Sequence, residues 1–168
     1  MLKIGDTAPS FCAANQDDVE ICSRDLAGKW IVLYFYPKDL TPGCTTQACD
    51  FTDKHSFFDD LDAVILGVSA DDTEKHRKFI DKYDLTITLL SDTSNKMCED
   101  FGVWQLKQFM GKEFMGVVRT TFIINPEGKI AAIWDKVSVR KKKSVKGEKI
   151  EILHVDEVRT KLQELQSI

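Results

Sequence analysis

The chain has 168 residues, of which 43% are hydrophobic and 30% are charged, and its formal net charge is −4. This length corresponds to about one domain and can bury a core without disulfide staples. The acidic balance argues against a broad nucleic-acid footprint, and the absence of a run of about 18 apolar residues argues against a membrane span. We therefore expect a single domain over residues 1–168.

The cysteine content bears on the compartment. Residues 1–11, MLKIGDTAPSF, lack the apolar core of a signal peptide, so we expect a cytoplasmic protein. Structural disulfides are rare in the cytoplasm, and five cysteines cannot all pair within one chain. Cys12, Cys22 and Cys98 carry no motif, so we expect them to be bystanders in the core or on the surface. Cys12 and Cys22 could still face each other across an N-terminal hairpin.

Strand and helix signals alternate along the chain. Residues 30–36, WIVLYFY, form a continuous apolar run typical of a strand buried on both faces. Thr41 and Pro42 follow as a hydroxyl N-cap and a first-turn proline, and they predict a helix over 41–59. The later segments predict a strand at 63–69, a helix opened by Asp72 and Thr73, a strand at 87–92, a short helix at 94–101, a strand at 118–124, an NPEG turn at 125–128, a hairpin strand at 129–134 and a closing helix at 155–166.

This order of elements predicts an α/β domain with a mixed central β-sheet flanked by helices. A thioredoxin-like fold with an N-terminal β-hairpin extension is the natural candidate. Cys44 would then lie at the carboxyl end of a central strand, which is the edge where open α/β sheets bind ligands.

Residues 35–51, FYPKDLTPGCTTQACDF, place Cys44 and Cys49 five positions apart. With Thr41 as the N-cap, Cys44 lies in the first helical turn, where free backbone N–H groups and the helix dipole stabilise negative charge. This position favours the thiolate, which is the nucleophilic form of cysteine. Gly43 leaves room for a small reactant, and Pro42 can shield one side of the sulfur.

The spacing of Cys44 and Cys49 also limits what the pair can do. Five helical residues correspond to about 7.5 Å of rise and about 500° of rotation, so an intact helix holds the two thiols too far apart to bond. A disulfide would require the helix to unwind. The pattern therefore favours a reactive Cys44 with which Cys49 condenses after local unfolding.

The segment PKDLTPGC, residues 37–44, fits the P-x-x-x-T/S-x-x-C pattern of peroxiredoxins. Together with TTQACDF, GKWIVLYFYPKD, LGVSADD and FMGVVRTTFIINPEGKI, it resembles the bacterioferritin-comigratory, or PrxQ, subgroup over most of the chain. The resemblance implies that Cys44 is the peroxidatic cysteine and Cys49 the resolving cysteine. It also implies that Thr41 hydrogen-bonds the thiolate and the peroxide oxygen.

The same resemblance assigns Pro37 and Pro42 to the shape and shielding of the pocket, and Arg119 to holding the thiolate and polarising the peroxide. A forked, permanently charged donor suits that role. The implied substrates are hydrogen peroxide and organic hydroperoxides, the implied reductant is thioredoxin or a similar dithiol, and the implied state is a monomer. No metal, haem or flavin is implied, and the histidines lack metal-ligand spacing; they are His55, His76 and His154.

Two other functions are consistent with a thioredoxin-like fold. Two thiolates and a histidine could carry Cu(I), although proteins of that kind resemble one another in a C-x₃-C spacing. A disulfide oxidoreductase or thiol-dependent holdase would resemble its relatives in a C-x-x-C and a proline before the hairpin strand, and residues 119–122 contain no proline. Residues 136–154 are longer and more basic than expected for the PrxQ subgroup, and we expect the run 140–143 to be a solvated loop or strand end.

Overall fold

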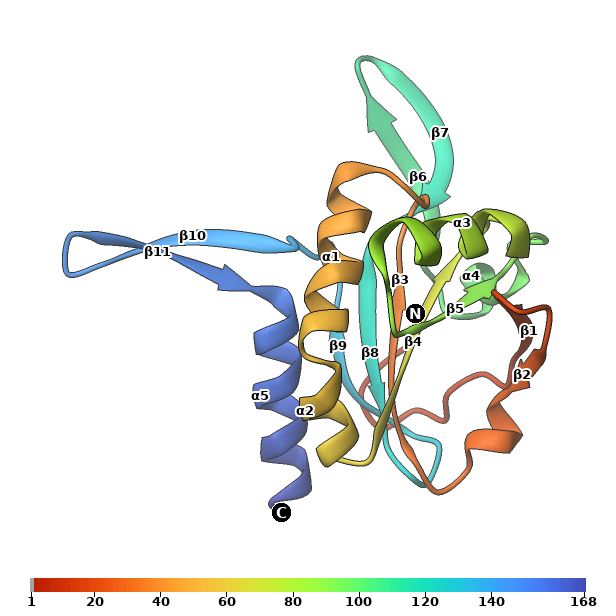
Figure 1. Ribbon diagram of the computed structural model, residues 1–168, viewed down its shortest axis with the longest axis horizontal. Helices are drawn as coiled ribbons and strands as arrows, with labels where there is room; N and C mark the ends of the chain where they lie inside the picture. Colours follow the sequence, from red (N-terminus) through yellow and green to blue (C-terminus); the bar gives the residue numbers. More distant parts are fainter. Residues whose placement is uncertain (1) are drawn as a thin grey trace.

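The computed structural model describes residues 2–168. Within that range a seven-stranded sheet has the order β2-β1-β5-β4-β3-β8-β9 (Figure 1). Its strands are Cys12–Asn15 (β1), Glu20–Cys22 (β2), Trp30–Phe35 (β3), Ala63–Ser69 (β4), Thr88–Ser91 (β5), Thr120–Ile124 (β8) and Ile130–Trp134 (β9). β3, β4 and β5 are parallel, whereas β1, β8 and β9 pair antiparallel with their neighbours, so the predicted mixed sheet is confirmed.

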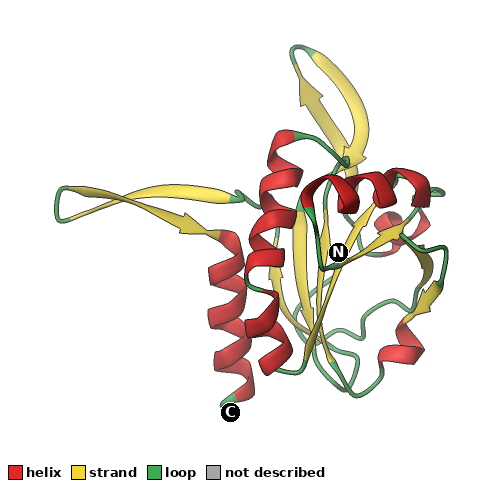
Figure 2. Cartoon of the chain, viewed as in Figure 1, coloured by secondary structure: helices red, strands yellow, loops and turns green. Residues whose placement is uncertain are grey.

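Helices cover both faces of this sheet (Figure 2). They are Pro42–Asp53 (α1), His55–Asp60 (α2), Thr73–Tyr83 (α3), Lys96–Asp100 (α4) and His154–Gln166 (α5), with a short 3-10 turn at Ser23–Leu26. Tyr34 of β3 packs in one apolar cluster with Phe51 of α1, whereas Phe35 packs in the cluster on the other face with Phe101. Burial on both faces explains the unbroken apolar run of β3. None of the helices within residues 2–168 is long and apolar enough to cross a membrane.

The single helix predicted over 41–59 was wrong, because the helix is interrupted at Lys54. There the backbone leaves helical geometry (φ −103°, ψ 7°), so that α1 ends at Asp53 and α2 begins at His55. The interruption redirects the chain, and the Phe58 ring is fully buried, 5.9 Å from the Phe51 ring.

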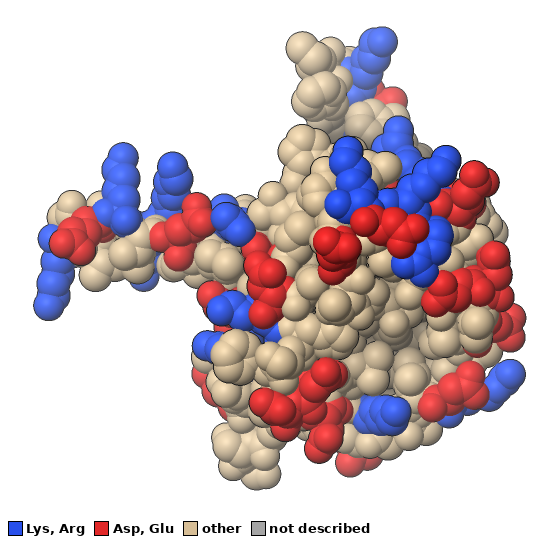
Figure 3. Space-filling view, viewed as in Figure 1, with Lys and Arg blue, Asp and Glu red and all other residues tan. Residues whose placement is uncertain are grey.

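Two further hairpins, which the sequence did not predict as strands, project from the body (Figure 1). They pair Trp104–Phe109 (β6) with Lys112–Val117 (β7), and Arg140–Val145 (β10) with Glu148–Leu153 (β11). The second hairpin, here called the arm, turns at Lys146 and Gly147, whose φ values of 52° and 81° suit a two-residue hairpin turn. The basic run 140–143 therefore forms the exposed end of a strand, the second of the two expected alternatives. Basic and acidic side chains alternate along the arm (Figure 3).

Cys12 and Cys22 form a disulfide across the N-terminal hairpin. The two residues are paired directly opposite each other in the register of β1 and β2, with their Cα atoms 4.1 Å apart, so the sulfurs are within bonding reach. The expectation that both were bystanders was therefore wrong. Cys98 is a free thiol buried in the core, where desolvation and the nearby Asp92 carboxylate raise its pKa well above the usual value.

Candidate active site

The first turn of α1 begins just beyond the carboxyl end of β3, on the central part of the sheet. Thr41 is the N-cap, with extended backbone angles, and Pro42 is the first helical residue. Cys44 follows in the same turn as a free thiol that is only 2% exposed. The unpaired N–H groups of a first helical turn favour negative charge at this position.

Arg119, which precedes β8, the strand next to β3 in the sheet, reaches Cys44. Its Nη2 atom lies 3.4 Å from Cys44 Sγ, and its Nη1 atom donates to Gln47 Oε1 at 2.5 Å. Gln47 is one helical turn after Cys44 and is 1% exposed. The sequence reasoning missed Gln47, although its i+3 spacing from Cys44 places the two side chains on one helix face.

Gly43 permits this approach of the guanidinium. A Cβ atom at position 43 would lie 3.2 Å from Arg119 Nη2, closer than ordinary van der Waals contact. Gly43 and Pro42 are exposed beside Cys44, and Pro37 is half-buried. Side-chain size at position 43 is thus limited by the arginine that contacts the thiol.

The Thr41 hydroxyl is directed elsewhere in this structure. Thr41 Oγ1 donates to the backbone carbonyl of Lys38 at 2.8 Å, and it makes no side-chain capping bond to α1. The hydroxyl therefore closes the turn that leads into the helix. To donate to a bound peroxide it would have to leave that carbonyl.

Cys49 lies further along α1, half-buried and unbonded to Cys44. Desolvation raises the pKa of the Cys49 thiol, the Asp53 and Asp50 carboxylates raise it further, and the Arg140 guanidinium opposes them. Cys49 is thus a poorer nucleophile than a fully exposed cysteine while α1 is folded.

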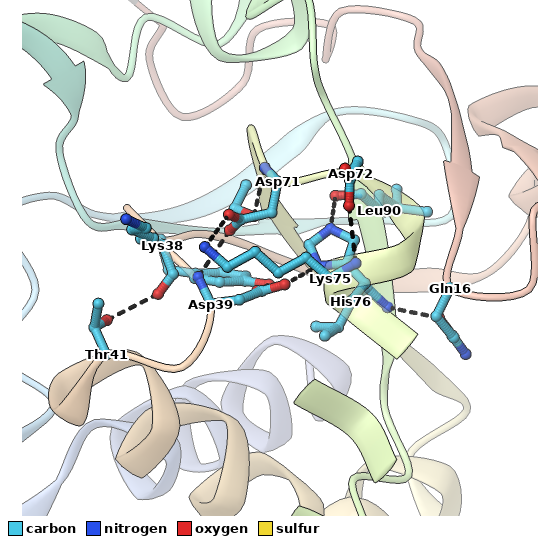
Figure 4. A network of polar contacts seen from close by, with 12 residues as sticks. Gln16, Lys38, Asp39, Thr41, Asp71, Asp72, Lys75, His76 and Leu90 are labelled. Atoms are coloured by element: carbon cyan, nitrogen blue, oxygen red, sulfur yellow. Dashed lines mark hydrogen bonds and ion pairs between the residues drawn. The ribbon is translucent and has the colours of Figure 1, made fainter. Parts of the chain in front are cut away.

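A buried polar network holds the loop that connects β3 to α1 (Figure 4). Asp39, in this loop, accepts from the Tyr36 hydroxyl at 2.5 Å and lies 2.5 Å from Nδ1 of His76 in α3. His76 Nε2 is 2.9 Å from the carbonyl of Leu90, which can only accept, so Nε2 carries a proton. The Asp39 N–H in turn donates to Asp71 at 2.7 Å.

The sequence reasoning missed this network, because its members come from separate elements. Asp39, Asp71 and His76 offer ligand atoms within 4.8 Å of one another, a grouping that could hold a metal ion. In the structure those atoms are engaged with protein partners, including Tyr36 and Ser69. The arrangement fixes the backbone immediately before Thr41.

The disulfide between Cys12 and Cys22 is remote from this site. Cys44 follows β3, and the strands β4 and β5 separate β3 from β1. The structure thus places Cys44, Arg119 and Gln47 together, and it places Cys49 further along the same helix.

Comparisons with known proteins agree with this geometry. Residues 4–133 match the AhpC/TSA family. The chain is 50% identical to peroxiredoxin Bcp of Bacillus subtilis, covering 83% of this chain and 88% of the relative, and 43% identical to peroxiredoxin Bcp of Escherichia coli, covering 80% and 86%.

Solved structures show the same similarity. The Xanthomonas campestris bacterioferritin comigratory protein, described in connection with alkyl peroxide reduction, superimposes with a TM-score of 0.81 at 34% identity, covering 98% of this chain and 97% of that one. A cysteine-to-serine mutant of Xylella fastidiosa PrxQ gives 0.85 at 31% identity, covering 99% and 98%. The chain therefore belongs to the AhpC/TSA family, and within that family it is a thiol peroxidase of the Bcp, or PrxQ, group of peroxiredoxins.

Proposed function

We propose that Cys44 is the peroxidatic cysteine of this peroxiredoxin and that Cys49 is its resolving cysteine. The observation that carries the proposal is the forked contact of Arg119 with Cys44 Sγ and Gln47 Oε1. A guanidinium held in this way stabilises the thiolate and the negative charge that develops on the peroxide oxygens. Gln47 keeps the fork oriented.

In the first step the Cys44 thiolate attacks the distal oxygen of a hydroperoxide. A sulfur–oxygen bond forms as the oxygen–oxygen bond breaks, and the departing oxygen takes a proton to leave as water or an alcohol. Pro37, Pro42 and Gly43 line the approach, and Thr41 contacts the peroxide after its hydroxyl rotates. The substrates are hydrogen peroxide and organic hydroperoxides.

In the second step Cys49 condenses with the sulfenic acid on Cys44. A disulfide bond forms, the sulfur–oxygen bond breaks, and the hydroxide leaves as water. Because α1 holds the two residues apart, the helix must unwind locally before the sulfurs can meet. A dithiol donor, thioredoxin, then reduces the disulfide by exchange and becomes oxidised itself.

The enzyme would act as a monomer in the cytoplasm. Three of its cysteines are free thiols, which suits a reducing compartment, whereas the disulfide between Cys12 and Cys22 is of a kind that is rare there. The peroxiredoxin relatives favour this function over a copper carrier or a disulfide oxidoreductase.

Rapid mixing of the reduced protein with one equivalent of hydrogen peroxide tests both assignments. Cys44→Ser should abolish fast peroxide consumption, and Cys49→Ser should retain it but accumulate sulfenic acid. If Cys44→Ser consumed peroxide as fast as wild type, Cys44 would not be the peroxidatic cysteine. If Cys49→Ser formed as much disulfide as wild type, Cys49 would not be the resolving cysteine. Adding thioredoxin and following the intact mass shows whether this donor reverses the disulfide.

A further inference from the structure

Asp50, the residue after Cys49, is held by an arginine from outside α1. The Asp50 side chain is only 3% exposed. Arg140, at the start of the arm, donates from Nη2 to Asp50 Oδ1 at 2.6 Å and from Nε to Asp50 Oδ2 at 3.2 Å. This two-point contact is the strong, directional form of an arginine–carboxylate pair.

The base of the arm, which carries Arg140, is itself anchored to the sheet. Arg140 pairs with Leu153 across the arm, and the backbone N–H of His154 donates to the carbonyl of Val139 at 2.9 Å. The side chain of His154 contacts Thr121 of β8 at 2.9 Å. The base of the arm lies beside α1 (Figure 1). Arg140 therefore connects α1 to the central sheet rather than to a free loop.

Unwinding the Cys49 segment of α1 would separate Asp50 from Arg140. The pair is worth more than an exposed ion pair, because the carboxylate is buried and both of its oxygens are bonded. The match to the AhpC/TSA family ends at residue 133, before Arg140 begins the arm. The contact thus comes from a part of this chain beyond the family match.

We propose that Arg140 is a positioning residue for the second step of the reaction: through Asp50 it holds the Cys49 segment of α1 folded and so delays disulfide formation. The inference rests on the proposed roles of Cys44 and Cys49. While the sulfenic acid waits, a second hydroperoxide can oxidise it to sulfinic acid and leave as water or an alcohol. Arg140 thereby sets the peroxide concentration at which the enzyme inactivates itself.

The first test measures disulfide formation after one equivalent of hydrogen peroxide, by rapid acid quench and intact mass. Arg140→Gln and Asp50→Asn should both form the Cys44–Cys49 disulfide about fivefold to thirtyfold faster than wild type. Both should also yield less sulfinic acid under excess peroxide. Arg140→Lys keeps the charge but loses the fork, so an intermediate rate is expected. Lys143→Gln, an exposed position on the same strand, is the matched control and should behave as wild type.

Arg140→Gln and Asp50→Asn together distinguish a loss of the contact that holds α1 folded from a change in the pKa of the Cys49 thiol. Arg140 lowers the pKa of the Cys49 thiol and Asp50 raises it. If only this charge effect mattered, Arg140→Gln would slow disulfide formation and Asp50→Asn would speed it. Opposite signs in the two variants would therefore overturn the proposal, as would unchanged rates in both.

Hydrogen exchange of the reduced protein provides a readout that needs no peroxide. The amides of residues 47–53 should exchange faster in Arg140→Gln and Asp50→Asn, while those of β4 keep their protection. Unchanged hydrogen exchange in α1 would contradict the proposal that the contact between Arg140 and Asp50 slows the unwinding of this helix. Faster exchange without any Cys44–Cys49 disulfide would instead show that the proposed function, and not the brake, had failed.

Discussion

Arg119 links two distant parts of the chain at the Cys44 thiol. It precedes β8, whereas Cys44 and Gln47 belong to α1, so the contact exists only when the sheet and the helix are packed. The guanidinium has five donors in a fixed plane, and two of its nitrogens are oriented by α1. Replacing it should affect reactivity more than folding.

Arg119→Gln should lower the second-order rate constant for Cys44 oxidation by about 100-fold to 1,000-fold, the range found when one charge-stabilising donor is removed from a reacting centre. Arg119→Lys should recover only part of the rate, because an ammonium lacks the fork. Stopped-flow measurement with hydrogen peroxide gives the constant. Arg24→Gln, on the exposed 3-10 turn, is the control. An Arg119→Gln rate equal to wild type would contradict the role.

At the scale of elements, α1 is defined from both ends by contacts to its neighbours. The loop before it is fixed by the fully buried pair of Asp39 and His76, and its last turn by Arg140. Removing the basic partner of a buried carboxylate lowers the free energy of unfolding strongly, because the remaining charge is buried without compensation. Replacing both partners by apolar residues is often tolerated.

His76→Leu should therefore destabilise the protein by about 3–5 kcal/mol, measured as the free energy of unfolding in urea. The double variant Asp39→Leu with His76→Leu should regain part of that loss. Arg77, the next residue in α3, makes exposed ion pairs to Asp81 of the same helix and to Asp17 of the turn between β1 and β2. Arg77→Gln removes both and should cost less than about 1 kcal/mol. A His76→Leu loss no larger than that of Arg77→Gln would rule out the buried pair as the anchor.

The junction of α5 with the sheet should make stability depend on pH. Burial, assisted by the charges of Lys141 and Arg119 and opposed by Glu157, lowers the pKa of His154 to about 4. The unfolded chain, with a histidine pKa near 6.5, binds the proton more readily. The contribution of neutral His154 to stability is therefore complete above about pH 6.5 and is lost as the pH falls toward 4.

His154→Gln should flatten this part of the pH profile. The loss of unfolding free energy between about pH 7 and about pH 4 should be smaller in the variant than in wild type by up to about 3 kcal/mol. Urea titrations of both proteins across that range give the difference. Equal slopes would exclude His154 as the titrating group.

The sequence predicted those elements whose signals are local. Residues 63–69 match β4, and Asp72 caps α3 by accepting from the N–H of Lys75 at 2.8 Å. The motif around Cys44 likewise lies in one continuous segment. The contact of Asp39 with His76 and that of Gln47 with Arg119 join residues distant in sequence, so no local pattern predicts these contacts.

The two projecting hairpins escaped prediction for a different reason. The strands of the arm are exposed along nearly their whole length. β10, RKKKSV, has no alternation of apolar and polar residues, and in β11 the alternation is confined to residues 149–152, too short a stretch to predict a strand. Each hairpin also depends on a two-residue turn, Met110-Gly111 in the first and Lys146-Gly147 in the arm. The first residue of each turn adopts a positive φ, which its side chain disfavours, so neither turn has a strong sequence signal.

For the whole molecule, the disulfide is a staple at one edge of the sheet. Cys12 and Cys22 close a loop of 10 residues between the two strands farthest from β9. A loop of this length restricts the unfolded chain enough to stabilise the fold by about 2–3 kcal/mol. Cys44 and Cys49 remain outside this constraint.

Counting thiols tests this division of the cysteines. Alkylation of the denatured, unreduced protein should modify three cysteines, Cys44, Cys49 and Cys98. After one equivalent of hydrogen peroxide only Cys98 should remain modifiable. Cys12→Ser with Cys22→Ser should keep the peroxidase rate and lose about 2–3 kcal/mol of unfolding free energy. Five modified cysteines in the unreduced protein would show that the staple is absent.

The arm has a practical consequence. Its outer turn, Lys146 and Gly147, is exposed, while Arg140 remains at the base and α5 is anchored in the core through Val155 and Val158. A peptide tag or a whole reporter domain inserted between residues 146 and 147 would extend the hairpin without entering the core. The same position would accept new chain ends in a circular permutant, so the arm offers a way to label this enzyme without altering Cys44 or its surroundings.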